Sequence, residues 1–304
     1  MTAVATTGGQ FNQTRGVMRF AELAQMGDVY FANSADSNGA SSGGYCVDAP
    51  TATLIQAQSL CNARTNQTNF ADFVYVGAGH AENIVGAAGM TFSKPGVTYV
   101  GQGVGRQRPT ITFKTATTAQ MIISGAGIKF QNMIFDFTGI DAIVAAILIT
   151  AVDVAFEDCE FITNSATAGC VLGILTAATA TRFRLTRCRF LGTAANSGTT
   201  TTAQVKHEVG ENFVIENCHF EGKVTQNFLN ATAIIAGLIN YCTFHTFTGT
   251  KGISVHASTQ ALIANCGFCV ASGAAPVVGT IVNVVKNAYT TEGVGVVAGT
   301  VTTF

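Results

Sequence analysis

The segment Ile215-Glu-Asn-Cys-His-Phe220 carries the pattern that decides the fold of this chain. Its first, fourth and sixth residues are apolar and its second and fifth are polar, which is the alternation of a β-strand interrupted once. A one-residue bend at Asn217 would restart the alternation, so that all three apolar side chains point inward. Asn suits such a bend because it tolerates the left-handed backbone conformation.

The same pattern occurs six times, and its fourth positions are 24 to 30 residues apart. The fourth residue is Met in the first copy and Cys in the other five. The copies span residues 130–135, 156–161, 185–190, 215–220, 239–244 and 263–268. A repeat of this length that is built from strands has no core of its own, so successive copies must stack. Parallel strands lie about 4.8 Å apart, which places each Cys above the previous Cys and each Phe above the previous Phe.

This stacking predicts an all-β fold, a single-stranded right-handed parallel β-helix, whose coils occupy residues 71–290. Residues 28–70 are expected to contain an opening strand, a loop and a short capping helix. Residues 1–27 lack the repeat and are interpreted as an N-terminal arm that grips a neighbouring molecule. Residues 291–304 form an apolar, Gly-rich C-terminal tail.

The capping helix is expected at residues 53–62, where apolar side chains recur shortly after Asp48 and Pro50. A helix in this place would cover the open edge of the first coil. An uncovered sheet edge would otherwise recruit other chains.

The composition excludes several kinds of partner. Charged residues make up 11% of the chain, with 16 basic and 17 acidic side chains, so neither nucleic acid nor an anionic membrane is predicted as a partner. A surface poor in charge is easy to bury, which favours a homo-oligomer or a place in a larger assembly. The longest apolar run, around residues 142–149, is shorter than the roughly 20 residues that span a bilayer.

The start of the chain and its cysteines indicate a reducing compartment. Residues after Met1 show neither the basic nor the apolar region of a secretory signal, so a signal peptide is not expected. The chain has nine cysteines, an odd number. Reduced, buried thiols therefore fit better than a disulfide framework.

The repeated Ile-x-Asn-Cys-x-Phe pattern resembles the coil signature of the pectin-lyase-like right-handed β-helix proteins. The stretches Val29-Tyr-Phe-Ala-Asn33, Asp48-Ala-Pro50 and Phe73-Val-Tyr-Val-Gly77 are similar to the opening sequence of many such proteins, particularly phage-encoded ones. The resemblance covers most of the chain and implies an opening strand, a capping helix and then the first coil. In polysaccharide-cleaving members, the active site lies on the outer face and uses converging acidic groups, a basic residue or a calcium-binding carboxylate cluster.

The catalytic motifs of that family are missing from this sequence. Polygalacturonase-type members carry Asn-Thr-Asp, Gly-x-Asp-Asp, Gly-His-Gly and Arg-Ile-Lys, and none of the four occurs here, which argues against hydrolysis. A calcium-dependent lyase would need several aspartates on one face. The aspartates that follow the helix are Asp72, Asp136, Asp141, Asp153 and Asp158. Only Asp136 and Asp158 are expected to approach each other, and two carboxylates make a weak calcium site.

Charged side chains flank the bends of three successive copies. They are Glu157 and Glu160, then Arg187 and Arg189, then Glu216 and His219. Opposite charges one coil apart are typical of a ladder of ion pairs between strands. We favour this structural interpretation over a functional site at these residues.

Three further motifs offer weaker candidates. The stretch Lys206-His-Glu-Val-Gly-Glu211 brings a base, an acid and an imidazole together, and it is interpreted as the best outward loop for binding or acid catalysis, or as a solvated corner. His80, in a Gly-rich turn, is expected to bond local backbone groups. Cys266-Gly-Phe-Cys269 has the spacing of a redox or zinc half-site, but Cys266 belongs to the internal ladder and no second pair exists. We therefore interpret the segment as a buried thiol followed by an outward or corner Cys.

The sequence supports no assignment of a catalytic, cofactor-binding or metal-binding residue, and no cofactor is expected. We predict a non-enzymatic structural protein of a phage virion, with a capsid decoration (cement) protein, acting as a homotrimer, favoured over a tail spike or fibre. Its expected partners are further copies of itself and the major capsid protein or other virion proteins, assembled in the host cytoplasm. The alternative is a tailspike-like protein that binds or cleaves glycans, as a polysaccharide lyase or glycoside hydrolase.

Overall fold

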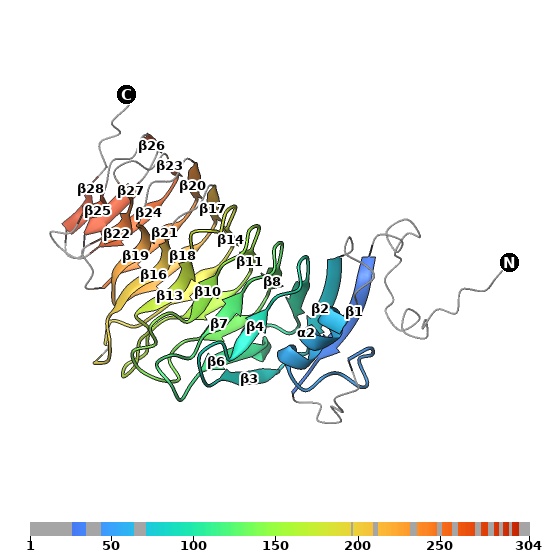
Figure 1. Cartoon of the computed structure of the whole chain (residues 1–304). Coiled ribbons are helices and arrows are strands. Elements are labelled where there is room, and N and C mark those ends of the chain that lie inside the picture. The colour runs from blue at the N-terminus through green and yellow to red at the C-terminus, as the bar shows by residue number, and fades with distance from the viewer. Residues whose placement is uncertain are drawn as a thin grey trace.

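The computed structural model describes residues 26–34, 44–63, 71–195, 197–208, 212–231, 236–247, 251–256, 261–270, 275–278, 283–285, 288–291 and 294–297. These residues form three sheets of ten, eight and ten strands, stacked coil upon coil along one axis (Figure 1). The predicted all-β parallel β-helix is therefore confirmed. Residues 1–25 of the expected N-terminal arm lie outside the described residues.

The first sheet contains the strand that opens each six-residue copy. Its strands are β1 (Met26–Ala32), β2 (Ala71–Val76), β5 (Thr98–Gly101), β8 (Lys129–Gln131), β11 (Ala155–Glu157), β14 (Arg184–Thr186), β17 (Phe213–Glu216), β20 (Gly237–Asn240), β23 (Ala261–Ala264) and β26 (Asn283–Val285). All neighbours in this sheet pair in parallel.

The second sheet contains the strand that closes each copy. Its strands are β3 (Ala81–Ile84), β6 (Thr110–Phe113), β9 (Ile134–Asp136), β12 (Glu160–Ile162), β15 (Arg189–Leu191), β18 (His219–Gly222), β21 (Thr243–Thr246), β24 (Gly267–Val270), β27 (Ala288–Thr291) and β28 (Val294–Val297). The strand β28, in the expected C-terminal tail, turns back and pairs antiparallel with β27.

The third sheet closes the coils on the remaining side. Its strands are β4 (Met90–Phe92), β7 (Met121–Ile123), β10 (Ile147–Ile149), β13 (Leu172–Thr176), β16 (Thr201–His207), β19 (Val224–Asn230), β22 (Lys251–Ser254) and β25 (Ala275–Val278). A 3₁₀ turn, η1 (Gly105–Gln107), lies at the corner between β5 and β6.

The predicted one-residue bend separates the first and second sheets in six coils. The third residue of each copy has a positive φ between 52° and 55°. These residues are Asn132, Asp158, Arg187, Asn217, Tyr241 and Asn265. Arg and Tyr enter this left-handed region at an energetic cost that Asn and Asp largely avoid, so stacking between coils must stabilise the bend where the local sequence does not.

The apolar residues of the copies form internal files. Successive Phe rings from Phe135 to Phe268 lie parallel, with centroids 4.5 to 5.2 Å apart, and the rings of Phe161, Phe190 and Phe220 are fully buried. Cys159, Cys188, Cys218, Cys242 and Cys266 form the second file, and each is buried and reduced. Burial raises the pKa of the Cys188 thiol well above its ordinary value, which keeps this thiol protonated.

The helix α2 (Leu54–Ala63) lies at the N-terminal end of the stack beside β1 and β2 (Figure 1). It buries Leu54, Ala57 and Cys61 against the first coil. Thr53 accepts a hydrogen bond from the backbone N–H of Gln56 (3.1 Å), and the Glu82 carboxylate accepts one from that of Leu54 (2.8 Å). The expected capping helix is thus present, held at its N-terminus by two acceptors. Among the described residues, no helix has the length and apolar character to cross a bilayer.

Polar side chains also lie inside the coils, which the pattern did not indicate. Asn227 donates to the Gln204 amide oxygen (2.8 Å), and Gln204 donates to the Thr163 hydroxyl (3.0 Å) and to the carbonyl of Glu221 (2.8 Å). Gln204 and Asn227 are fully buried, on the adjacent strands β16 and β19. The coils from about residue 163 to 230 are therefore held together by amide hydrogen bonds as well as by apolar packing.

Alternation along β23 supplies a direct test of the inward register. Ile263 is fully buried whereas its neighbour Leu262 is 38% exposed. Replacing Ile263 with Ala should lower the free energy of unfolding by about 2 to 5 kcal/mol, because it leaves a cavity. Leu262→Ala, the matched control, should cost less than about 1 kcal/mol. Urea unfolding followed by circular dichroism measures both, and equal losses would contradict the register.

Candidate functional surface

The outer face beside the bend carries the charges that the sequence places one coil apart. Glu157, at the end of β11, forms ion pairs with Lys129 and Arg187 and accepts a hydrogen bond from Gln131 (2.8 Å). The hydrogen bonds from Lys129 and Gln131 lower the pKa of Glu157 to about 2. This carboxylate is ionised at neutral pH and bound by groups from the coils on both sides of it.

Two arginines hold aspartates in the preceding coil through two hydrogen bonds each. Arg187 bonds Asp158 through Nε (2.8 Å) and Nη2 (2.9 Å), and Arg182 bonds Asp153 through Nε (2.6 Å) and Nη2 (2.5 Å). The hydrogen bond from Arg182 lowers the pKa of Asp153. The predicted ion-pair ladder is confirmed for Arg187.

One expected ion pair of the ladder, at Glu160, has a different partner. Glu160 pairs with Arg108, at 2.7 Å, and not with Arg189. Arg108 precedes β6, two strands away from β12 in the second sheet, and its long side chain spans the intervening coil. His219 bonds Glu221 (3.1 Å) and Thr243 (2.6 Å), so it also stays within the second sheet.

The prediction that residues 206–211 form an outward loop is wrong for His207. Lys206 and His207 lie in β16, and His207 is fully buried between the rings of Phe183 and Phe213. Its Nδ1 bonds the Thr176 hydroxyl at 2.5 Å. Desolvation lowers the pKa of His207 to about 4, so the ring is neutral at pH 7. Lys206 pairs with Glu208 on the outside, and residues 209–211 lie outside the described residues.

The remaining histidine candidate has a structural role, as expected. The Nδ1 atom of His80 accepts a hydrogen bond from the backbone N–H of Ser34 (2.9 Å), and its Nε2 faces Glu82 at 3.2 Å. His80 is buried. It therefore links the end of the opening strand to the carboxylate that holds the start of α2.

The aspartates are not gathered into a calcium site. Asp136 accepts hydrogen bonds from Thr138, whereas Asp158 is bound to Arg187, so the two do not share a site. Burial alone would raise the pKa of Asp141, but hydrogen bonds from the backbone N–H groups of Thr199 and Gly169 lower it overall. Within the described ranges, no group of three or more His, Cys, Asp or Glu side chains is placed to hold a metal ion.

The two thiols of the CxxC segment lie in different environments. Cys266 is buried in the internal file, whereas Cys269 lies in β24 and is partly exposed. This separation agrees with the interpretation of a buried thiol followed by an outward one. It follows from strand alternation after the bend at Asn265.

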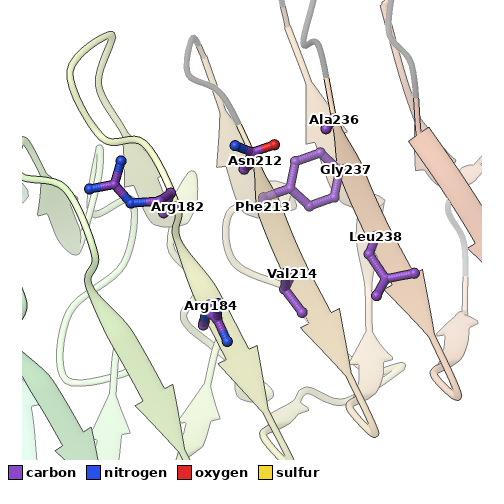
Figure 2. A pocket seen from close by; sticks show the side chains of 8 residues that line it. All are labelled: Arg182, Arg184, Asn212, Phe213, Val214, Ala236, Gly237 and Leu238. Atoms are coloured by element: carbon purple, nitrogen blue, oxygen red, sulfur yellow. The ribbon is translucent and has the colours of Figure 1, made fainter.

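A shallow groove on the outer face of the first sheet was missed by the sequence analysis. Figure 2 shows that its lining comes from three successive strands, β14, β17 and β20, and from the corners before them. The lining residues are Arg182, Arg184, Asn212, Phe213, Val214, Ala236, Gly237 and Leu238. The signal was available, because Arg184, Val214 and Leu238 each immediately precede a six-residue copy and so face outward in one row.

Comparisons with known proteins give a structural similarity but no family for this chain. No protein-family model matches the chain, and no curated protein matches its sequence. Among solved structures, the chain is similar to a rhamnogalacturonan lyase at 12% sequence identity and a TM-score of 0.46, over 84% of this chain and 87% of the other. Similarity at this level says nothing about the chemistry of this chain.

The buried imidazole predicts a specific pH dependence of stability. An unfolded histidine has a pKa of about 6.5, whereas that of His207 is about 4. Between these two pH values the unfolded chain binds more protons than the folded chain. The free energy of unfolding should therefore keep its full value above about pH 6.5 and fall by about 3 kcal/mol as the pH decreases to about 4.

Urea unfolding between pH 4.5 and 7 measures this slope. His207→Phe should remove most of the slope, whatever its effect on stability at pH 7. His256→Phe, at an exposed position, should retain it. An unchanged slope in His207→Phe would assign the pH dependence to other groups.

Proposed function

We propose that this chain is a non-enzymatic structural protein that acts through its rigid shape and outer surface. One observation carries the proposal: the three acidic side chains beside the bend at Asp158 are all held in ion pairs. Lys129 and Arg187 hold Glu157, Arg108 holds Glu160, and Arg187 also holds Asp158. A carboxylate with a pKa near 2, such as Glu157, is a poor general acid and a weak base at neutral pH.

The more specific proposal is a capsid decoration protein of a phage virion that assembles as a homotrimer. A β-helix resists bending because each coil is bonded to the next along three sheets. With 11% charged residues, its surface can be buried against other copies or a shell at little desolvation cost. The likeness of the opening sequence to phage-encoded β-helix proteins supports the same assignment.

The second candidate is a glycan-binding protein of the tailspike type. The groove between β14 and β20 favours it, because the groove combines an exposed guanidinium with an apolar floor. A recognition role of this kind is compatible with a virion component and requires no catalytic acid.

Incubation with bacterial surface polysaccharides tests the proposal that the chain is not an enzyme. We expect neither reducing ends nor absorbance from unsaturated sugars after prolonged incubation, because Glu157, Glu160 and Glu208 are held in ion pairs. Product formation that disappears in Glu157→Gln or Glu208→Gln, but persists in the control Glu216→Gln, would replace the structural proposal with an enzymatic one.

The assembly role is tested in solution. Light scattering should give the mass of three chains of 31.5 kDa each, and the purified trimer should bind empty virus-like shells. A chain that lacks residues 1–25 keeps β1 complete, so it should retain its circular dichroism spectrum and thermal transition but lose binding to the shells. A monomer, or shell binding unchanged by the truncation, would contradict the proposal.

A further inference from the structure

The groove of Figure 2 follows from the register of three neighbouring strands. Arg184 pairs with Val214, and Val214 pairs with Leu238, so these three outward side chains form one row across the first sheet. The corner residues two positions earlier, Arg182 and Asn212, form a second row beside it. The groove thus has a charged end at β14 and an apolar end at β20.

Two small residues line the groove at the start of β20. They are Ala236, which precedes the strand, and Gly237, its first residue. Gly237 pairs with Phe213, and a Cβ atom at this position would overlap the Phe213 ring. The ring packs inward against Phe228 and His207. Glycine at 237 is therefore required by the core, because the Phe213 ring occupies the space that a side chain would need.

The two arginines of the groove differ in their availability. Arg182 donates two guanidinium hydrogen bonds to Asp153 in the preceding coil. The Arg184 side chain is exposed and, among the described residues, makes no hydrogen bond or ion pair, although its charge also acts on Asp153 from a longer distance. The groove therefore carries one guanidinium that no carboxylate bonds, directly beside the partly exposed apolar side chain of Val214.

We propose that this groove binds an acidic sugar residue of a polysaccharide. The carboxylate or sulfate group bonds the Arg184 guanidinium, which is suited to planar, two-point recognition of oxyanions. The apolar face of the sugar ring lies on Val214 and Leu238, and the Asn212 amide bonds a ring hydroxyl. A nucleic acid fits less well, because it requires several cations along its backbone and the chain has a net charge of −1.

Two variants at one position test the role of the charge. Val214→Glu places a carboxylate on the strand next to Arg184 and in register with it, so it neutralises the guanidinium. Val214→Gln has nearly the same size without the charge. Calorimetric titration with hyaluronan oligosaccharides, dextran sulfate and neutral dextran should show binding of an anionic series only, with Val214→Glu weakening it at least tenfold more than Val214→Gln does. The two anionic series distinguish carboxylate from sulfate recognition.

A second pair of variants separates the groove from general electrostatic attraction. Arg184→Ala and Arg189→Ala each remove one exposed arginine from the same coil, but Arg189 lies in β15 of the second sheet, outside the groove. Arg184→Ala should weaken binding at least tenfold and Arg189→Ala less than twofold.

Equal losses in the two arginine variants, equal effects of Val214→Glu and Val214→Gln, or binding of neither anionic series would overturn the proposal. It does not depend on the assembly role, because trimer formation and shell binding are read without any sugar. Failure of one therefore leaves the other standing.

Discussion

The one-residue left-handed bend between the first and second sheets is the constraint on which the structure depends. It resets strand alternation, so that a short segment directs apolar side chains inward from both of its strands. Because the bend recurs at the same place in successive coils, equivalent residues come to lie over one another. The parallel Phe rings and the file of buried thiols are consequences of this superposition.

Superposition also determines what the outer surface can do. Like charges at equivalent positions would repel each other about 4.8 Å apart, so acidic and basic residues alternate between coils, as Glu157 does with Lys129 and Arg187. This arrangement stabilises the stack and holds the carboxylates of Glu157 and Asp158 in ion pairs. Arg184 departs from the pattern because its neighbour in the next coil is Val214 and not an acid.

The interior of the middle coils departs from a purely apolar core. The Oδ1 atoms of Asn164 and Asn227 and the Nε2 atom of His207 are buried without a protein partner in the described structure. Buried polar atoms of this kind cost about 1 to 3 kcal/mol each, so the amide network around Gln204 must recover stability through its own hydrogen bonds. Such groups also fix the register of coils, because a shift of one residue would break every bond among them.

The sequence by itself determined the parallel coils, the bend and the files of Cys and Phe, because each follows from a periodicity that any stacked strand must obey. The capping helix followed from a different signal, the apolar residues that recur shortly after Asp48 and Pro50. It also indicated the ion pairs that Arg187 forms with the preceding coil. Only the tertiary structure decided that His207 points inward, that Glu160 pairs with Arg108 and that a groove opens beside Arg184. The inward His207 and the Arg108 ion pair depend on the length of corners and on contacts between residues far apart in the chain, which no local pattern encodes. The outward row of Arg184, Val214 and Leu238 can be read from the repeat, but the hollow along it cannot.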